Sequence, residues 1–194
     1  MAESEQQRCW YHLQIWCYGQ WLPGDPRGFR SHRGRYLSTG DYKNPPRQGE
    51  HAGLYRNARN SLKHPPVTLS IQQRELVGKH LLQYCQSKQI PMLALSMGEC
   101  HGHALIACGF AQDGLTLGKM KRYATIESRR VDRTLPTPLF GKRSENPRCR
   151  TYQHLNATFN YILEHRHQAH WVWAVACEQF DPRAAYFFDF EIEQ

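Results

Sequence analysis

Hydrophobic and polar positions along the chain follow two different periods, which predict both strands and helices. The expected strands are short aromatic or apolar runs bounded by turn residues, at 9–18, 90–97, 101–110 and 171–177. The expected helices carry apolar side chains at three- and four-residue spacing, over 70–88, 115–130 and 152–168. Ser70 and Gln73 form a capping-box pattern where the first of these helices begins.

The segments between these elements are basic and rich in proline and glycine. The longest, at about 22–66, has no sustained periodicity apart from one short helix expected near 54–62. Another, at 134–148, is expected to hold a loop and an irregular edge strand. The length of 194 residues fits one domain, or one domain with extensions, and no internal repeat is visible, so the sequence predicts a single domain over residues 1–194.

The order of elements predicts an α+β fold. It runs strand, helix, strand, strand, helix, weak strand, helix, and the turn signal Gly98-Glu99 joins the second and third strands into a hairpin. A split β-α-β arrangement satisfies this order, with an antiparallel sheet and helices packed on one face.

Composition narrows the classes of protein to which the chain can belong. Hydrophobic residues make up 40% of the 194, enough for one core, and no apolar run approaches the ~20 residues of a membrane helix. Residues 1–8 are polar and acidic, unlike a secretory signal, so a cytoplasmic location is expected. Seven scattered cysteines without a Cys-x-x-Cys pair argue against a zinc knuckle or a disulfide framework.

The positive charge favours a polyanionic partner. Lys and Arg outnumber Asp and Glu by 25 to 17, and nucleic acid is the simplest such partner, although charge does not distinguish DNA from RNA. The residues expected to contact its backbone lie in the long loop and in the basic run of the second helix: Arg27, Arg30, Arg33, Arg35, Lys119, Lys121 and Arg122. Charge runs of this kind also occur as solvated faces.

His101-Gly102-His103 is the first candidate for chemistry. Strand side chains alternate between faces, so both imidazoles project from one face and Gly102 from the other. Two imidazoles on one strand can bind one metal ion, and histidine is the commonest metal ligand. Short His-x-His runs also occur by chance, and the residues alone leave that alternative open.

The last expected helix carries two more candidates for chemistry, Tyr161 and His165. At about 100° per residue, Tyr161 and His165 lie one turn apart on a polar stripe beside the apolar face of the helix. Packing that face on the sheet would bring the stripe to the rim of the sheet. A tyrosine with its hydroxyl in water and a solvated histidine form the alternative interpretation.

Four segments, in this order, resemble the single-tyrosine HUH transposases, including the REP-associated tyrosine transposases. They are WCYGQWLPGDPRGF at the first strand, MLALSMGECHGHALI around the histidines, LFGKRSENPRCR after the second helix and FNYILEHRHQAHWVW in the last helix. The name HUH denotes two histidines that flank one residue, usually bulky and hydrophobic, and here Gly102 stands in that place. This departure leaves open a decayed or repurposed copy.

The resemblance implies a ferredoxin-like core and a metal-dependent DNA transesterase. His101, His103 and His165 would bind the metal, and Tyr161 would be the nucleophile that forms a 5′-phosphotyrosine and leaves a 3′-hydroxyl. The implied metal is Mg²⁺ or Mn²⁺, whereas imidazole ligands by themselves suit Zn²⁺, and Mn²⁺ reconciles the two best. The implied substrate is single-stranded DNA with a hairpin, in the bacterial cytoplasm or nucleoid.

Two alternatives from other functional classes stay open. A catalytically inactive nucleic-acid-binding protein on the same fold would bind DNA without forming a covalent bond to it. A zinc hydrolase would use the same three histidines and no tyrosine nucleophile. Members of the family occur as monomers and as homodimers that exchange the tyrosine helix, and the sequence does not choose between them.

Overall fold

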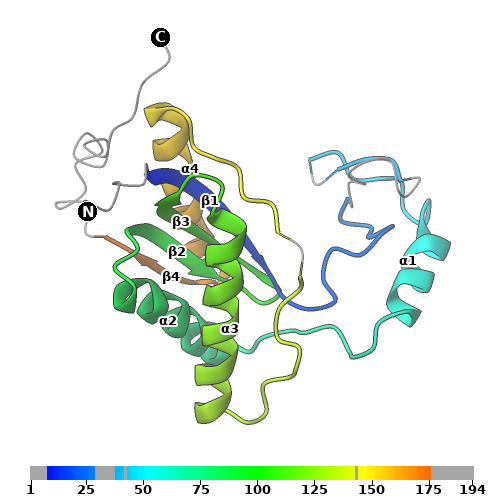
Figure 1. Cartoon of the computed structure of the whole chain (residues 1–194). Helices are drawn as coiled ribbons and strands as arrows, with labels where there is room; N and C mark the ends of the chain where they lie inside the picture. Colours follow the sequence, from blue (N-terminus) through cyan, green and yellow to red (C-terminus); the bar gives the residue numbers. More distant parts are fainter. Residues whose placement is uncertain (1–7, 29–37, 42, 143, 176–194) are drawn as a thin grey trace.

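The computed structural model describes residues 8–28, 38–41, 43–142 and 144–175. Within these residues one antiparallel sheet has the strand order β1-β3-β2-β4 (Figure 1). Its strands are β1 (Arg8–Trp16), β2 (Met92–Met97), β3 (His101–Gly109) and β4 (Trp171–Ala174). Because β1 and β2 flank β3 and both run antiparallel to it, they are parallel to each other, which is the split β-α-β arrangement. The predicted α+β class is confirmed.

The predicted helices are also present, with ends shifted by a few residues. They are α1 (Ala52–Asn60), α2 (Ile71–Ser87), α3 (Asp113–Val131) and α4 (Tyr152–Glu164), and the 3-10 helix η2 (His165–Gln168) directly follows α4. The capping box of α2 is confirmed, since the backbone N–H of Gln73 donates to Ser70 Oγ at 3.2 Å and that of Ser70 donates to Gln73 Oε1 at 3.1 Å. No helix in the described part of the chain has the length and apolar character needed to cross a bilayer.

Helices cover both faces of the sheet. Figure 1 shows α2 and α3 in front of the strands and α4 behind them. Leu81 of α2 and Leu117 of α3 belong to one buried cluster, whereas Phe159 of α4 belongs to a second cluster with Trp10 and Leu105. As expected, α2 and α3 share one face of the sheet, whereas α4 covers the opposite face. The reason is that alternate residues on both faces of β1 and β3 are apolar and need cover.

The predicted irregular edge strand lies along β1. Backbone N–H groups of Gly141 and Cys149 donate to the carbonyls of Trp16 and Trp10, both at 2.9 Å. With this segment beside β1, the order segment-β1-β3-β2 completes the ferredoxin-like core, and β1 is not left as an open edge. The outer end of the last predicted strand, residues 176–177, lies outside the described residues.

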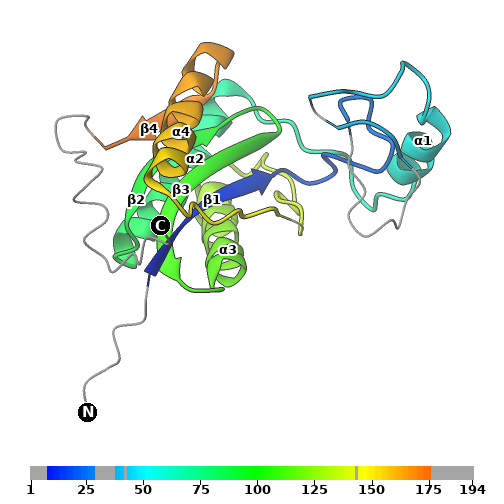
Figure 2. The same cartoon turned by 90° about the horizontal axis from the view of Figure 1, so that it is seen from above.

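The described part of the long loop does not cover the sheet. It carries α1, which has no buried residue and lies to one side of the core in both views (Figures 1 and 2). The loop returns to the core through Val67 and Leu69, which are buried with the α2 and α3 layer. Arg27, near the start of the loop, lies next to the first residues of β3, since its Nη1 group donates to Cys100 Sγ.

Close approach of two strands explains the glycine between the two histidines of β3. Gly102 faces the α2 and α3 layer and pairs with Met97 of β2. A Cβ built on Gly102 would overlap the Ser96 carbonyl oxygen and lie 2.8 Å from Met97 Sδ. There is no room for a bulky side chain at this position, and the opposite face of β3, which carries His101 and His103, is unaffected.

Gly102→Ala is expected to lower the free energy of unfolding by about 1–3 kcal/mol, because the added methyl group forces the β2 backbone to move. Gly118→Ala is the matched control: an added Cβ on this exposed α3 residue meets nothing within 4 Å, so the change should stabilise by up to about 1 kcal/mol. Urea unfolding measures both variants. Equal stability of Gly102→Ala and the wild type would contradict the close approach.

Candidate metal centre

Three histidines from two parts of the chain meet on the face of the sheet that α4 covers. His101 and His103 project from β3 onto this face, and His165 reaches it from the first residue of η2. One ring nitrogen of each lies within 4.8 Å of the other two. Nitrogens that share an ion at about 2.1 Å lie at most about 4.2 Å apart, so small side-chain rotations complete the set. These three residues can hold a metal ion.

Two of the three histidines are oriented by hydrogen bonds at Nδ1. His165 Nδ1 lies 2.8 Å from the carbonyl oxygen of Tyr161, and His103 Nδ1 lies 2.9 Å from His12 Nε2. The His103 Nε2 atom is buried and has no hydrogen-bond partner within the described structure. Metal-binding histidines are arranged in this way, with one ring nitrogen held by a neighbour and the other facing the ion. The residues present therefore fit a metal.

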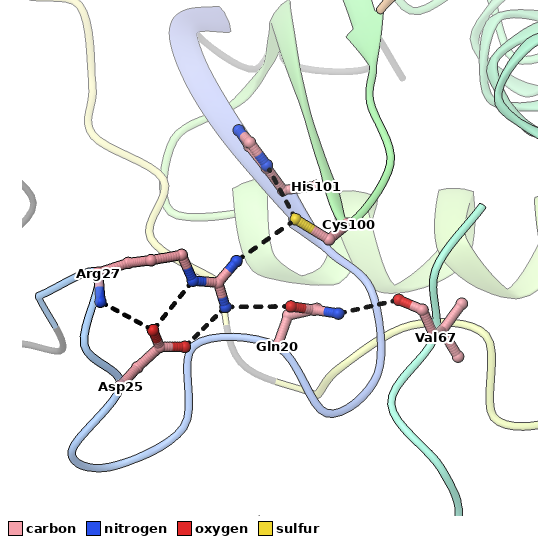
Figure 3. Close-up of polar contacts among 6 residues, drawn as sticks. All are labelled: Gln20, Asp25, Arg27, Val67, Cys100 and His101. Atoms are coloured by element: carbon pink, nitrogen blue, oxygen red, sulfur yellow. Dashed lines mark hydrogen bonds and ion pairs between the residues drawn. The ribbon is translucent and has the colours of Figure 1, made fainter. Parts of the chain in front are cut away.

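His101 stands at the end of a polar chain that begins in the loop after β1 (Figure 3). Its Nδ1 lies 3.6 Å from Cys100 Sγ, to which the Nη1 group of Arg27 donates at 3.7 Å. Arg27 donates from Nε and Nη2 to the buried Asp25 at 2.9 and 2.6 Å, and from Nη2 to Gln20 Oε1 at 3.1 Å. The loop thus holds a guanidinium group beside the metal centre.

Tyr161 lies one turn before His165, and its ring contacts the histidine cluster. The centroid of the Tyr161 ring lies 4.6 Å from that of His165, 5.2 Å from that of His103 and 5.8 Å from that of His12. The tyrosine is nevertheless 47% exposed, so one side of its ring meets the histidines while another faces solvent. The four residues predicted for metal binding and nucleophilic attack are brought together.

Two further histidines belong to this cluster, and sequence reasoning missed both. His12 contacts His103 from β1, and the ring of His170 lies 4.6 Å from His165 and 5.4 Å from His101 between centroids. A side chain at Gly98 would overlap the His170 ring, so the glycine makes room for it. Strand alternation in residues 9–18 was a usable signal for His12, whereas no periodicity extends to His170.

Burial keeps four histidines of the cluster neutral: His12, His101, His103 and His170. Desolvation, with smaller contributions from neighbouring positive or titratable groups, lowers the pKa of His12, His101 and His170 to about 4. The same causes lower the pKa of His103 well below its usual value. Neutral imidazole is the form that binds a metal, so His101 and His103 need not release protons at neutral pH when an ion binds.

Of the residues predicted to contact nucleic acid that the structure describes, Arg27 alone lies beside the histidines (Figure 3). Lys119 and Arg122 are exposed on α3, on the opposite side of the sheet, and their contacts stay predictions. The other arginines of the long loop lie outside the described residues: Arg30, Arg33 and Arg35.

Lys121 corrects one of these predictions. Its side chain is buried, and its Nζ donates to the carbonyl oxygen of Gly141 at 3.1 Å. Burial lowers its pKa to about 8. Helix phase explains the difference, since Lys121 lies on the inner face of α3 between two exposed positions and cannot reach a phosphate from there.

No family model, curated protein or solved structure matches this chain.

His103→Ala and His165→Ala are each expected to weaken binding of Mn²⁺ or Zn²⁺ by more than about 100-fold, because a lost ligand costs more than a lost outer partner. His80→Ala is the matched control, since His80 bonds to Ser128 Oγ at 2.9 Å in the α2 and α3 layer. Isothermal titration calorimetry measures all three variants. A similar loss in the control would point to general destabilisation instead of ligand removal.

The low pKa values predict that acid destabilises the metal-free protein. Well above pH 6.5, His12, His101 and His170 are neutral in both folded and unfolded chains. Between pH 6.5 and about 4, His12, His101 and His170 become protonated in the unfolded chain but stay neutral in the folded chain. Because the unfolded chain binds more protons in this range, the free energy of unfolding falls as the pH is lowered. Urea titrations in a chelator from pH 8 to pH 4 measure the slope, which should become shallower in a His101→Asn, His170→Asn double variant.

Proposed function

We propose that the protein is a metal-dependent enzyme that nicks and joins single-stranded DNA through a covalent bond to Tyr161. The observation that carries the proposal is the placement of Tyr161 on the turn before His165. Its ring packs against His103 and His165, and almost half of its surface stays open to a substrate. A nucleophile must be close to the metal and yet reachable by a phosphodiester, and this position meets both needs.

The resemblance to single-tyrosine HUH transposases supports the same proposal. Its four segments are far apart in sequence, and each contributes to the surroundings of the histidines. The first supplies the last residue of β1, Trp16, and the loop with Arg27, and the second supplies His101 and His103. The third supplies the segment along β1, and the fourth supplies Tyr161 and His165. The proposed substrate, single-stranded DNA with a hairpin, follows from this resemblance and from the basic excess of the chain.

The proposed reaction exchanges one phosphodiester for another. The Tyr161 oxygen forms a bond to phosphorus as the bond from phosphorus to the 3′ oxygen breaks. The phenol loses its proton and the leaving 3′ oxygen gains one, so the products are a 5′-phosphotyrosine and a free 3′-hydroxyl. Because the phosphotyrosine is itself a phosphodiester, a 3′-hydroxyl can reverse the step and join strands without ATP.

A metal held by His101, His103 and His165 would supply charge neutralisation at the scissile phosphate. We propose Mn²⁺ for this centre, with Mg²⁺ as the alternative that the resemblance implies. Imidazole nitrogen suits transition metals, whereas Mg²⁺ prefers oxygen ligands, and Mn²⁺ accepts both.

Arg27 is proposed to contact the DNA backbone next to the centre. Both oxygens of Asp25 accept from its guanidinium group, and Trp21 lies under it at 4.9 Å from the ring centroid. The side chain is still 43% exposed, so a fixed positive charge faces solvent near His101. An arginine held in this way loses little conformational freedom when it binds a phosphate.

A second candidate function is a zinc hydrolase at the same histidines, favoured by the all-nitrogen ligand set. It predicts tightly bound zinc and no covalent bond to DNA. A catalytically inactive DNA-binding protein on this fold likewise predicts no covalent bond, and it does not require a metal.

The purified protein is expected to form a covalent adduct with hairpin-containing single-stranded DNA in Mn²⁺ or Mg²⁺, visible as a shifted band on a denaturing gel. Tyr161→Phe removes the attacking oxygen and should abolish the adduct. Tyr152→Phe is the matched control on the same helix, 39% exposed, and should leave the yield unchanged. Absence of an adduct from a panel of hairpin strands would reject the proposed reaction in favour of its two rivals.

A further inference from the structure

We infer that His12 is a positioning residue of the metal centre, which accepts the Nδ1 proton of His103 and thereby directs the Nε2 atom of His103 toward the metal. The inference deepens the proposed function and rests on it for the role of His103. It adds to the candidate metal centre a residue from β1, the strand next to the one that carries His101 and His103.

The geometry of two neighbouring strands brings the two rings together. In the β1 and β3 register, His12 pairs with Leu105 and His103 pairs with Gln14, so the two histidines are diagonal neighbours on the same face. Their ring nitrogens are 2.9 Å apart, and their centroids 5.0 Å apart with 43° between the planes. This is a hydrogen-bond distance between side chains 91 positions apart in sequence.

Only one assignment of the shared proton leaves His103 able to bind a metal. If His12 were the donor, neutral His103 would carry its proton on Nε2, a buried atom without a hydrogen-bond partner in the described structure. A buried N–H without an acceptor is costly, and a protonated nitrogen cannot bind an ion. If His103 is the donor, its buried Nε2 carries the lone pair, and this is the nitrogen left free to join His101 and His165 in binding an ion.

His12 also lies against the proposed nucleophile. Its ring centroid is 5.8 Å from that of Tyr161, with 68° between the planes, so an edge of one ring meets the face of the other. One side chain therefore contacts both a metal ligand and the tyrosine. We expect a change at His12 to alter the orientation of His103 first, because the hydrogen bond is directional and the ring contact is weaker.

The chemistry of the contact predicts which substitutions preserve it. Phenylalanine at position 12 keeps a planar ring of similar size and has no acceptor. Glutamine has a carbonyl oxygen that can accept the His103 proton from a similar distance along the side chain. A role in packing alone would favour phenylalanine, whereas a positioning role favours glutamine.

The test measures Mn²⁺ and Co²⁺ affinity of the full chain by calorimetry in the wild type, His12→Phe and His12→Gln. His12→Phe is expected to weaken binding by about 10–100-fold, the usual effect of losing an outer partner, and His12→Gln to restore most of it. The Co²⁺ absorption spectrum should change in His12→Phe and return in His12→Gln. His80→Phe, which removes a hydrogen bond on the far side of the sheet, is the control for folding.

Long-range ¹H–¹⁵N spectra give a second readout that needs neither metal nor DNA. They report which ring nitrogen of His103 carries the proton, and Nδ1–H is expected in the wild type. Protonation on Nε2, or a His12→Phe variant with wild-type affinity, would overturn the inference. A wild-type protein that binds no metal would overturn the proposed function, and the His103 spectrum of that protein would still show whether His12 accepts the Nδ1 proton of His103.

Discussion

The pairing of β3 between β1 and β2 is the constraint on which the rest of the structure depends. It assigns alternate residues to two faces, so that Ala104 and Ile106 enter the layer under α2 and α3 while His101 and His103 face α4. Because the period of a strand is two, a shift of one residue would exchange these faces and bury the imidazoles in the main core. Gly102 also favours this register, because β2 approaches it too closely for any side chain at this position.

Burying several imidazoles together is unfavourable unless their nitrogens find partners. His12 and the Tyr161 carbonyl supply partners for two of them, while His103 Nε2 and His170 Nδ1 stay unpaired in the described structure. Unpaired buried polar atoms are rare in folded proteins and call for an explanation. A metal ion explains the His103 atom directly, which ties the electrostatics of the fold to the function we propose.

The two faces of the sheet have different chemical roles. The α2 and α3 face is apolar and closed, and even Lys121 on α3 is held inside it by Gly141. The α4 face carries the histidines and the partly exposed Tyr161, and Asp25 holds Arg27 at its edge. This separation explains why a basic run on α3 is a poor guide to where a phosphate would meet the metal, whereas one arginine in a loop is well placed.

Local patterns along the chain determined the helices and strands, the common face of His101 and His103, and the single turn between Tyr161 and His165, because each depends on a backbone period within one element. Tertiary structure alone decided that α4 covers its own face, that His170 lies over Gly98, and that His12 bonds to a residue 91 positions away. Such contacts depend on strand order and register between distant segments, which no local period encodes. The sequence therefore determined where the three histidines and the tyrosine lie within their elements, and the resemblance implied their roles. Tertiary structure determined the residues that orient them.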